Sequence, residues 1–305
     1  MQSWKGATRG GLTGYKFFIF NLRFFGLDFA YFLLAFVVIY FVPFAPKASR
    51  SIYFYFRNVR KQSIFKAVIS IFRNYYVFGQ VLLDKTALLA GFNTKFTYDF
   101  DGEYRLHDLA NRKQGALLVG AHAGNWEIAG QLLERIDTNF HVVMYEAEHE
   151  RIKNLMDHVL VKKKVDIIAI KSDMSHLAKI KEAFDNNDFV ALHGDRVVEG
   201  SKYILCDFYG KKAALPTGPF YIATKFQVPL LVVSAMKQSR RHYHFHATEP
   251  KVYPYMGNPK KRTEQMHLIM RDYITEISAM LDKYPLQWFN YYEFWEEQKS
   301  SKTEE

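Results

Sequence analysis

The chain has 305 residues, of which 49% are hydrophobic and 17% aromatic, and it carries a formal net charge of +10 with a single cysteine, Cys206. This length and hydrophobic content exclude a mini-domain and a disordered chain, and one cysteine excludes an internal disulfide. A strongly basic protein needs anionic partners. Because no nucleic-acid-binding module can be recognised, anionic lipid headgroups or an acidic carrier protein explain the charge better than nucleic acid.

The N-terminal part has the pattern of a membrane anchor. Residues 1–23 are basic without an acid, and residues 24–44 are apolar with one charge, Asp28. The apolar stretch has close to the ~20 residues that span hydrocarbon. We therefore predict a membrane-anchor helix that Pro43 and Pro46 end. A helix lying in the interface and a buried core helix are the alternatives.

The residues after the anchor predict one large domain, over 45–298, and a polar tail over 299–305. The start of the domain is basic without an acid, which by the positive-inside rule keeps the domain on the cytoplasmic side. Residues 63–83 have the apolar spacing of an amphipathic helix.

From about residue 96, apolar runs that are typical of buried strands alternate with helical patterns. The strands are predicted at 115–120, 140–145, 165–170, 189–193 and 229–236, and the helices at 126–136, 148–161, 174–184, 216–226 and 263–283. An antiparallel pair is predicted at 241–248 and 252–255. This alternation predicts an α/β fold, with a mostly parallel mixed sheet flanked by helices on both faces.

The strongest chemical signal is the turn after the first of these strands, Gly120-Ala-His-Ala-Gly-Asn-Trp-Glu127. Ligands of open α/β sheets bind at the carboxyl ends of strands. If His122 lies in the turn and Glu127 in the first helical turn, with Asn125 as N-cap, the two side chains can converge. A histidine–carboxylate pair can take the proton from a hydroxyl. The alternative is a capped helix with an unremarkable loop histidine.

The stretch GAHAGNWEIAG resembles the His-x4-acid motif of the lipid A biosynthesis acyltransferases. These are the lauroyl and myristoyl transferases of Gram-negative bacteria, related to the lysophospholipid acyltransferases. Further blocks resemble that family in order along nearly the whole chain: HGDR at 193–196, DFYG at 207–210 with LPTGP at 215–219, QVPL at 227–230, and PLQWF at 285–289 with Trp295.

The resemblance implies an acyltransferase in which His122 deprotonates the acceptor hydroxyl and Glu127 assists. The hydroxyl then attacks an acyl thioester of acyl carrier protein or coenzyme A, without a covalent acyl-enzyme and without a cofactor. Asn125, Asp195 and Arg196 are the candidates for oxyanion stabilisation or substrate binding. The expected location is the bacterial inner membrane, with a lipid or glycolipid acceptor.

One segment departs from the family pattern. Residues 145–154 are acidic where the family usually has a cation, and Arg151 is the candidate substitute. The acceptor could therefore differ from a lipid A precursor: a lysophospholipid, an amino-acid lipid or an aryl-polyene-type pigment. A non-catalytic lipid-binding homologue is a further alternative.

Three histidines alternate along one predicted strand, at 242, 244 and 246, and would share a face. They suggest a metal hydrolase as a rival, but no nearby cysteine or acid in the sequence completes a four-ligand set, so we expect no metal. The chain also has no G-x-S-x-G elbow and no P-loop.

Overall fold

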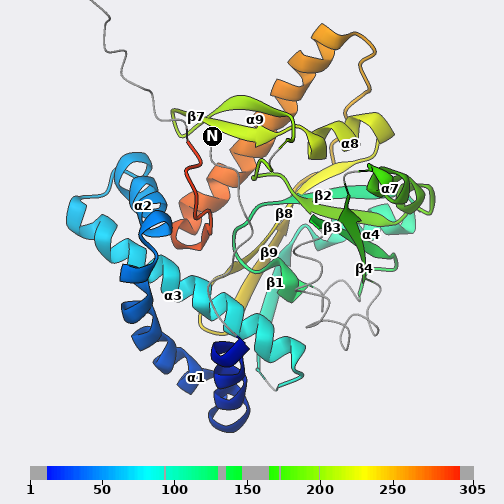
Figure 1. Cartoon of the computed structure of the whole chain (residues 1–305). Coiled ribbons are helices and arrows are strands. Elements are labelled where there is room, and N and C mark those ends of the chain that lie inside the picture. The colour runs from blue at the N-terminus through cyan, green and yellow to red at the C-terminus, as the bar shows by residue number, and fades with distance from the viewer. Residues whose placement is uncertain are drawn as a thin grey trace, which may run out of the picture.

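The structure is a computed structural model that describes residues 12–92, 94–129, 135–145, 165–171, 173–198 and 200–295. The predicted helix at 148–161 and the candidate Arg151 lie outside the described residues, as does the tail. An open sheet forms the centre of the molecule, and a layer of long N-terminal helices lies beside it (Figure 1).

The sheet has seven strands in the order β1-β9-β8-β2-β5-β3-β4. Their bounds are β1 Thr97–Asp101, β2 Ala116–Gly120, β3 Phe140–Tyr145, β4 Val165–Ile170, β5 Phe189–His193, β8 Leu230–Lys237 and β9 His242–Ala247. Strand β9 runs antiparallel to β8, β1 runs parallel to β9, and the remaining neighbours are parallel. The predicted fold class, an α/β fold with a mostly parallel mixed sheet, is confirmed.

Both faces of the central strand β2 are covered, because its side chains alternate between two cores. Leu117 and Val119 pack in the main core, which includes the buried stripe of helix α9 (Pro259–Lys283). Leu118 packs in a second core, with Leu106 of α4 (Glu103–Asn111). All five residues of β2 are buried, which is why its sequence is a continuous apolar run rather than an alternating one.

Helix α9 begins four residues before the predicted helix at 263–283. Asn258 caps it by accepting hydrogen bonds from the main-chain N–H groups of Lys260 and Lys261, and Pro259 occupies the first turn, where its missing N–H costs nothing. The remaining sheet-flanking helices are α7 Ser175–Asp185 and α8 Gly218–Phe226, with single 3-10 turns η2 Trp126–Ala129 and η4 Pro285–Gln287.

One local expectation differs from the structure, and one hairpin was not predicted. The segment 252–255 is not a strand: β9 pairs with β8 and with β1 instead. Pro254 lacks the N–H that a ladder needs, so β1 takes the place beside β9. A separate hairpin, β6 Tyr203–Phe208 with β7 Lys211–Pro216, precedes α8, and Cys206 is buried on β6.

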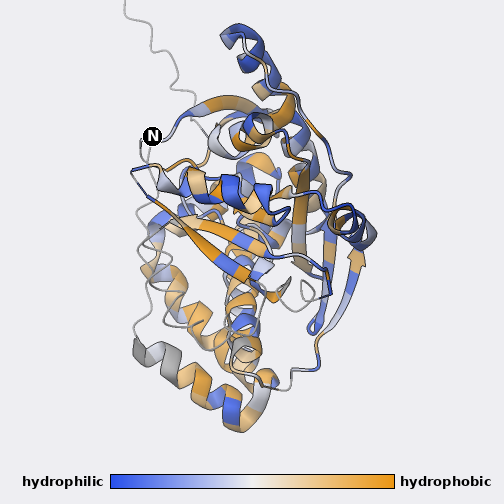
Figure 2. Ribbon diagram, turned by 90° about the vertical axis from the view of Figure 1, so that its right-hand side faces the viewer, coloured by the Kyte–Doolittle hydropathy of each residue, from blue (hydrophilic) through white to orange (hydrophobic). Residues whose placement is uncertain are grey.

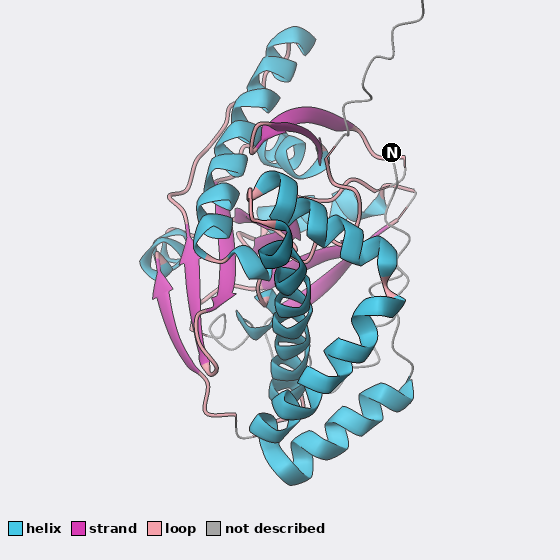
Figure 3. Ribbon diagram, turned by 90° about the vertical axis from the view of Figure 1, so that its left-hand side faces the viewer, coloured by secondary structure: helices cyan, strands magenta, loops and turns pink. Residues whose placement is uncertain are grey.

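The N-terminal layer consists of α1 Leu12–Phe44, α2 Pro46–Phe54, a π turn Tyr55–Val59 and α3 Ile64–Leu89. Helix α1 kinks at Gly26 (φ 79°) and ends directly after Pro43. It lies against α3, and a Cβ on Gly79 of α3 would come within 2.5 Å of the Leu34 side chain on α1. Figure 3 shows the two helices side by side.

One face of α1 is buried against the protein and the other is exposed and apolar. Residues Phe17–Phe44 are long and apolar enough to cross a membrane by length and composition, with 28% of the most apolar window buried. The buried face is fixed by Tyr31, whose hydroxyl bonds to buried Asp84 of α3. Figure 2 shows how strongly apolar this helical layer is. The exposed face consists mainly of phenyl rings: Phe17, Phe20, Phe24, Phe25, Phe29, Phe32, Phe36 and Phe44.

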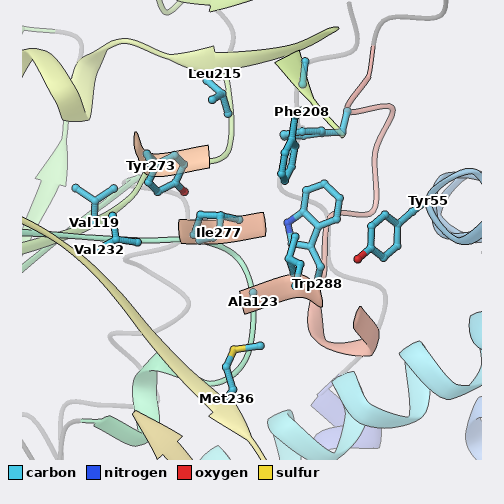
Figure 4. Close-up of a cluster of buried hydrophobic side chains, with 14 of the residues drawn as sticks. Tyr55, Val119, Ala123, Phe208, Leu215, Val232, Met236, Tyr273, Ile277 and Trp288 are labelled. Carbon is cyan, nitrogen blue, oxygen red and sulfur yellow. The ribbon is translucent and has the colours of Figure 1, made fainter. Parts of the chain in front are cut away.

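An aromatic cluster joins the helical layer to the sheet. The ring of Trp288 lies 5.1 Å from that of Tyr55 and 5.8 Å from that of Phe208, and Ala123 and Met236 lie nearby (Figure 4). This cluster explains the tryptophan of the C-terminal PLQWF block: its indole packs directly behind the loop that carries His122.

Candidate active site

The register of the sheet brings His122 and Asp195 together. Gly120, the last residue of β2, pairs with His193, the last residue of the neighbouring strand β5. The N–H of Gly194 continues the pairing by donating to the Gly120 carbonyl at 2.9 Å. His122 and Asp195 each follow two residues later, so both leave the same edge of the sheet side by side, at the carboxyl ends of parallel strands.

His122 and Asp195 form a two-point contact. The Nδ1 of His122 lies 2.6 Å from Oδ1 of Asp195, and the main-chain N–H of His122 donates to Oδ2 at 3.0 Å. The indole N–H of Trp288 also donates to Oδ2, at 3.4 Å. The Asp195 side chain is 3% exposed and that of His122 is 21% exposed, so the carboxylate is enclosed while the imidazole remains reachable.

Asp195 is held as a carboxylate. Burial alone would raise the pKa of its carboxyl group, but the charge and hydrogen bond of His122, together with the charge of Arg196, hold that pKa well below its usual range. A buried, ionised acid that accepts from the Nδ1 of an imidazole fixes the ring tautomer, places the lone pair on Nε2 and stabilises the imidazolium.

A second histidine occupies the other side of the ring. The Nδ1 of His193 lies 3.3 Å from Nε2 of His122, and the ring centroids are 4.2 Å apart. The Nδ1–H of His122 donates to Asp195, so the Nε2 of His122 has no hydrogen. The hydrogen bond between the two rings must therefore be donated by His193. It follows that His193 carries its hydrogen on Nδ1 and a lone pair on Nε2. Burial and the nearby charge of His122 lower the pKa of His193, which keeps its ring neutral.

Glu127 does not join this group. Its carboxylate forms an ion pair with Lys85 of α3 at 2.6 Å, and within the described residues no hydrogen bond or ion pair connects it to His122. The expected convergence of the two side chains is therefore absent from this structure. The reason lies in the main chain: the N–H of Asn125 bonds to Ala235 of β8 at 2.7 Å, which turns the residues that follow toward α3.

In this structure the side chains of Asn125 and Arg196 bond to neighbouring segments of the chain, and their expected roles in oxyanion stabilisation or substrate binding stay predictions. The buried amide nitrogen of Asn125 donates to the Val81 carbonyl and the Tyr243 hydroxyl, and its Oδ1 accepts from no described residue, so it does not cap the following turn. The guanidinium of Arg196 donates to the Phe289 carbonyl at 2.9 Å and to Asn290 at 3.3 Å. Both side chains thus fix neighbouring segments in place, while the charge of Arg196 still acts on Asp195.

Gly124 lets the His122 loop fit between β8 and the C-terminal segment. Its φ is +66°, and a Cβ there would lie 2.1 Å from the main-chain oxygen of Ala235. Its N–H donates to the Gln287 carbonyl at 3.0 Å, and the Phe289 N–H donates to the His122 carbonyl at 2.9 Å. The PLQWF block therefore pairs with the loop of His122 in an antiparallel manner.

We expect Gly124→Ala to lower the free energy of unfolding by about 2 kcal/mol or more, because the positive φ alone costs roughly 1–2 kcal/mol for a residue with a Cβ and the overlap with Ala235 adds to it. Urea unfolding measures the change. Gly257→Ala is the matched control, since no atom lies within 4 Å of a Cβ there. Equal stability of the two variants would contradict the packing described for this loop.

The histidines of β9 face carboxylates of β1. His242 and His244 both approach Asp99, at 3.1 and 2.9 Å, and His244 also approaches Asp101 at 3.4 Å. Within the part of the chain that the structure describes, no group of three or more potential ligands could hold a metal ion.

Comparison with known proteins agrees with the family that the sequence resembles. The sequence model of the family described as bacterial lipid A biosynthesis acyltransferase matches residues 61–296. No curated protein is similar enough to count as a match. Among solved structures, the 1-acyl-sn-glycerophosphate (LPA) acyltransferase PlsC from Thermotoga maritima is 13% identical, with a TM-score of 0.39, over 83% of this chain and 98% of that one. Because the family match covers most of the chain, including the loop of His122 and the block of Asp195, this protein belongs to the bacterial lipid A biosynthesis acyltransferases.

Proposed function

We propose that the protein transfers a fatty acyl group from a thioester of acyl carrier protein or coenzyme A to a hydroxyl of a lipid A precursor or a similar glycolipid. One observation carries the proposal: Asp195, His122 and His193 form a continuous hydrogen-bonded row at the carboxyl ends of β2 and β5. Such a row can take up a proton from a hydroxyl and hold the resulting positive charge.

The reaction needs one proton to move and one bond to be exchanged. The acceptor oxygen attacks the thioester carbonyl carbon while its proton passes to the histidine row, and His122 becomes an imidazolium stabilised by Asp195. Collapse of the tetrahedral intermediate breaks the carbon–sulfur bond, and the leaving thiolate takes the proton back. No protein group is acylated, and the charges balance at every step.

His193 presents the lone pair in this row. The Nε2 of His122 already accepts a hydrogen bond from His193, so the acceptor hydroxyl meets the Nε2 of His193. The hydroxyl proton moves onto the Nε2 of His193. At the same time, the Nδ1 proton of His193 moves to the Nε2 of His122. The lowered pKa of His193 favours this role at neutral pH, since the ring stays unprotonated and able to accept.

We therefore expect His193→Asn to reduce kcat roughly 10–100-fold, at the low end of general-base effects. The asparagine amide can still donate to His122, but it cannot accept and release a proton. His107→Asn, at an exposed position on α4, is the control and should leave kcat unchanged. A full rate for His193→Asn would instead assign direct contact with the hydroxyl to His122.

Membrane association follows from α1. Its exposed phenyl rings would be costly in water and suit the boundary between headgroups and acyl chains. The proposed location is the bacterial inner membrane, with the domain on the cytoplasmic side, where acyl thioesters are made.

The acceptor and donor can be identified by one set of reactions. Purified protein is mixed with acyl carrier protein thioester or coenzyme A thioester, and with a lipid A precursor, a lysophospholipid or a lipid extract, and the products are separated by mass spectrometry. We expect an acyl ester of the glycolipid. Esters formed only on another acceptor would replace the lipid A assignment, and no product with any acceptor would favour the non-catalytic, lipid-binding alternative.

A further inference from the structure

A cavity of about 800 Å³ lies between the helical layer and the edge of the domain, next to the catalytic loop. It is bounded by α1, α3, the turn between β8 and β9, and the end of α9 with η4. Its floor includes Gln287, whose carbonyl accepts from Gly124 in the His122 loop. The cavity is thus separated from the catalytic loop by one main-chain segment.

The cavity contains more positive than negative charge. Two of its four cations are neutralised: Lys237 pairs with buried Asp84, and Arg240 pairs with Asp28 at 2.9 Å. The other two, Arg73 of α3 and Lys283 at the end of α9, form no ion pair with any described residue. A cleft with two such cations attracts a phosphate or another anionic group.

The side of the cavity formed by α1 is apolar. Phe32 of α1 lines it and is 58% exposed, and Phe29 and Phe36, one turn away on either side, continue the exposed surface. Tyr76 and Tyr284, which are half-buried, also line the cavity. Arg73 and Lys283 are both exposed, and cations that lie beside exposed phenyl rings match an amphiphile with an anionic head and an apolar tail. They do not match a small soluble anion, which would gain nothing from the rings.

We propose that this cavity binds the headgroup of an anionic membrane phospholipid, with the phosphate at Arg73 and Lys283 and the acyl chains along the exposed face of α1. The bound lipid fills the space between α1 and the domain, and sets the depth at which the catalytic loop meets the membrane. The site is independent of the acyl-transfer chemistry, since none of the residues lining it belongs to the histidine row.

Native mass spectrometry of the full-length protein in detergent tests the proposal. Phosphatidylglycerol and phosphatidylcholine are added separately, and the fraction of lipid-bound protein is measured. We expect one phosphatidylglycerol to bind at least about tenfold more tightly than phosphatidylcholine, since each cation near an anionic headgroup contributes about fivefold in affinity. The double variant Arg73→Gln/Lys283→Gln should lose that preference.

The double variant Lys260→Gln/Lys261→Gln is the matched control. It also removes two positive charges, but from exposed side chains at the start of α9, outside the cavity. Circular dichroism of both variants establishes that they fold. Equal binding of the two lipids by the wild type would overturn the proposal, and so would an unchanged preference in the cavity variant or an equal loss in the control.

Discussion

Replacement of His122 by glutamine is expected to lower kcat for acyl transfer by about 1,000-fold, within the range that general-base catalysis supplies. Glutamine has nearly the size of histidine and can accept a hydrogen bond, but it cannot take up a proton. The variant would then have no imidazole beside Asp195 to carry the positive charge. The rate is measured as transfer of a labelled acyl group from the thioester to lipid.

The control for this variant is His107→Gln, a histidine of α4 whose side chain is 41% exposed and approaches Glu103 at 3.7 Å rather than the histidine row. It should keep the wild-type rate. If His122→Gln is folded by circular dichroism and still transfers acyl groups within a few-fold of wild type, the imidazole of His122 does not receive the proton that His193 passes on, and the proposed mechanism fails.

Asp195→Asn is expected to lower kcat by about 100-fold or more. The amide can occupy the same space, but it cannot neutralise the imidazolium, and it can offer an N–H to His122 in place of an acceptor, which favours the wrong ring tautomer. Glu127→Gln is the matched comparison, because it also replaces a carboxylate by an amide in the same loop region. Since Glu127 pairs with Lys85, its replacement should cost less than about fivefold, the scale of a partly buried ion pair.

The reverse order, with Glu127→Gln more damaging than Asp195→Asn, would show that Glu127 reaches His122 during turnover.

The stability of Asp195→Asn, measured as a function of pH, tests the charge of Asp195 separately. The pKa of Asp195 is lower in the folded protein than in the unfolded chain, so its ionised form stabilises the fold above about pH 4, and this contribution is lost as the pH falls through the folded-state pKa. Asp195→Asn should therefore be destabilised at pH 7, and the gap from wild type should narrow in acid.

The core elements could be predicted because their sequences leave few alternatives. The run Ala116–Gly120 is apolar throughout, which only a strand buried on both faces requires, and the long apolar stripe of α9 has the helical period. Edge elements were harder: β1 is short and half exposed, and residues 252–255 include strand-forming valine and tyrosine although Pro254 prevents a strand.

The site was predicted only in part, because the order of the strands in the sheet cannot be predicted from the sequence pattern. His122 stands out through its place in a glycine-flanked loop after a strand. Asp195 lies 73 residues away and becomes its partner only because β2 and β5 are neighbours. His193 gives no separate signal: it ends a strand, and its role follows from the register that pairs it with Gly120. Local spacing predicts Glu127 as the partner, but the contacts that turn it away, from Asn125 to β8 and from Glu127 to Lys85 of α3, depend on the tertiary fold.

The most direct test asks whether the acyl group passes to the lipid without an acyl-enzyme. In one reaction of the wild-type enzyme, mass spectrometry measures the amount of thiol released, the amount of lipid ester formed and the mass of the protein. The proposed mechanism predicts one lipid ester for each thiol released, no thiol release without the lipid acceptor, and no acyl group on the protein at any time. Thiol released without acceptor, or protein whose mass rises by one acyl group, would contradict it.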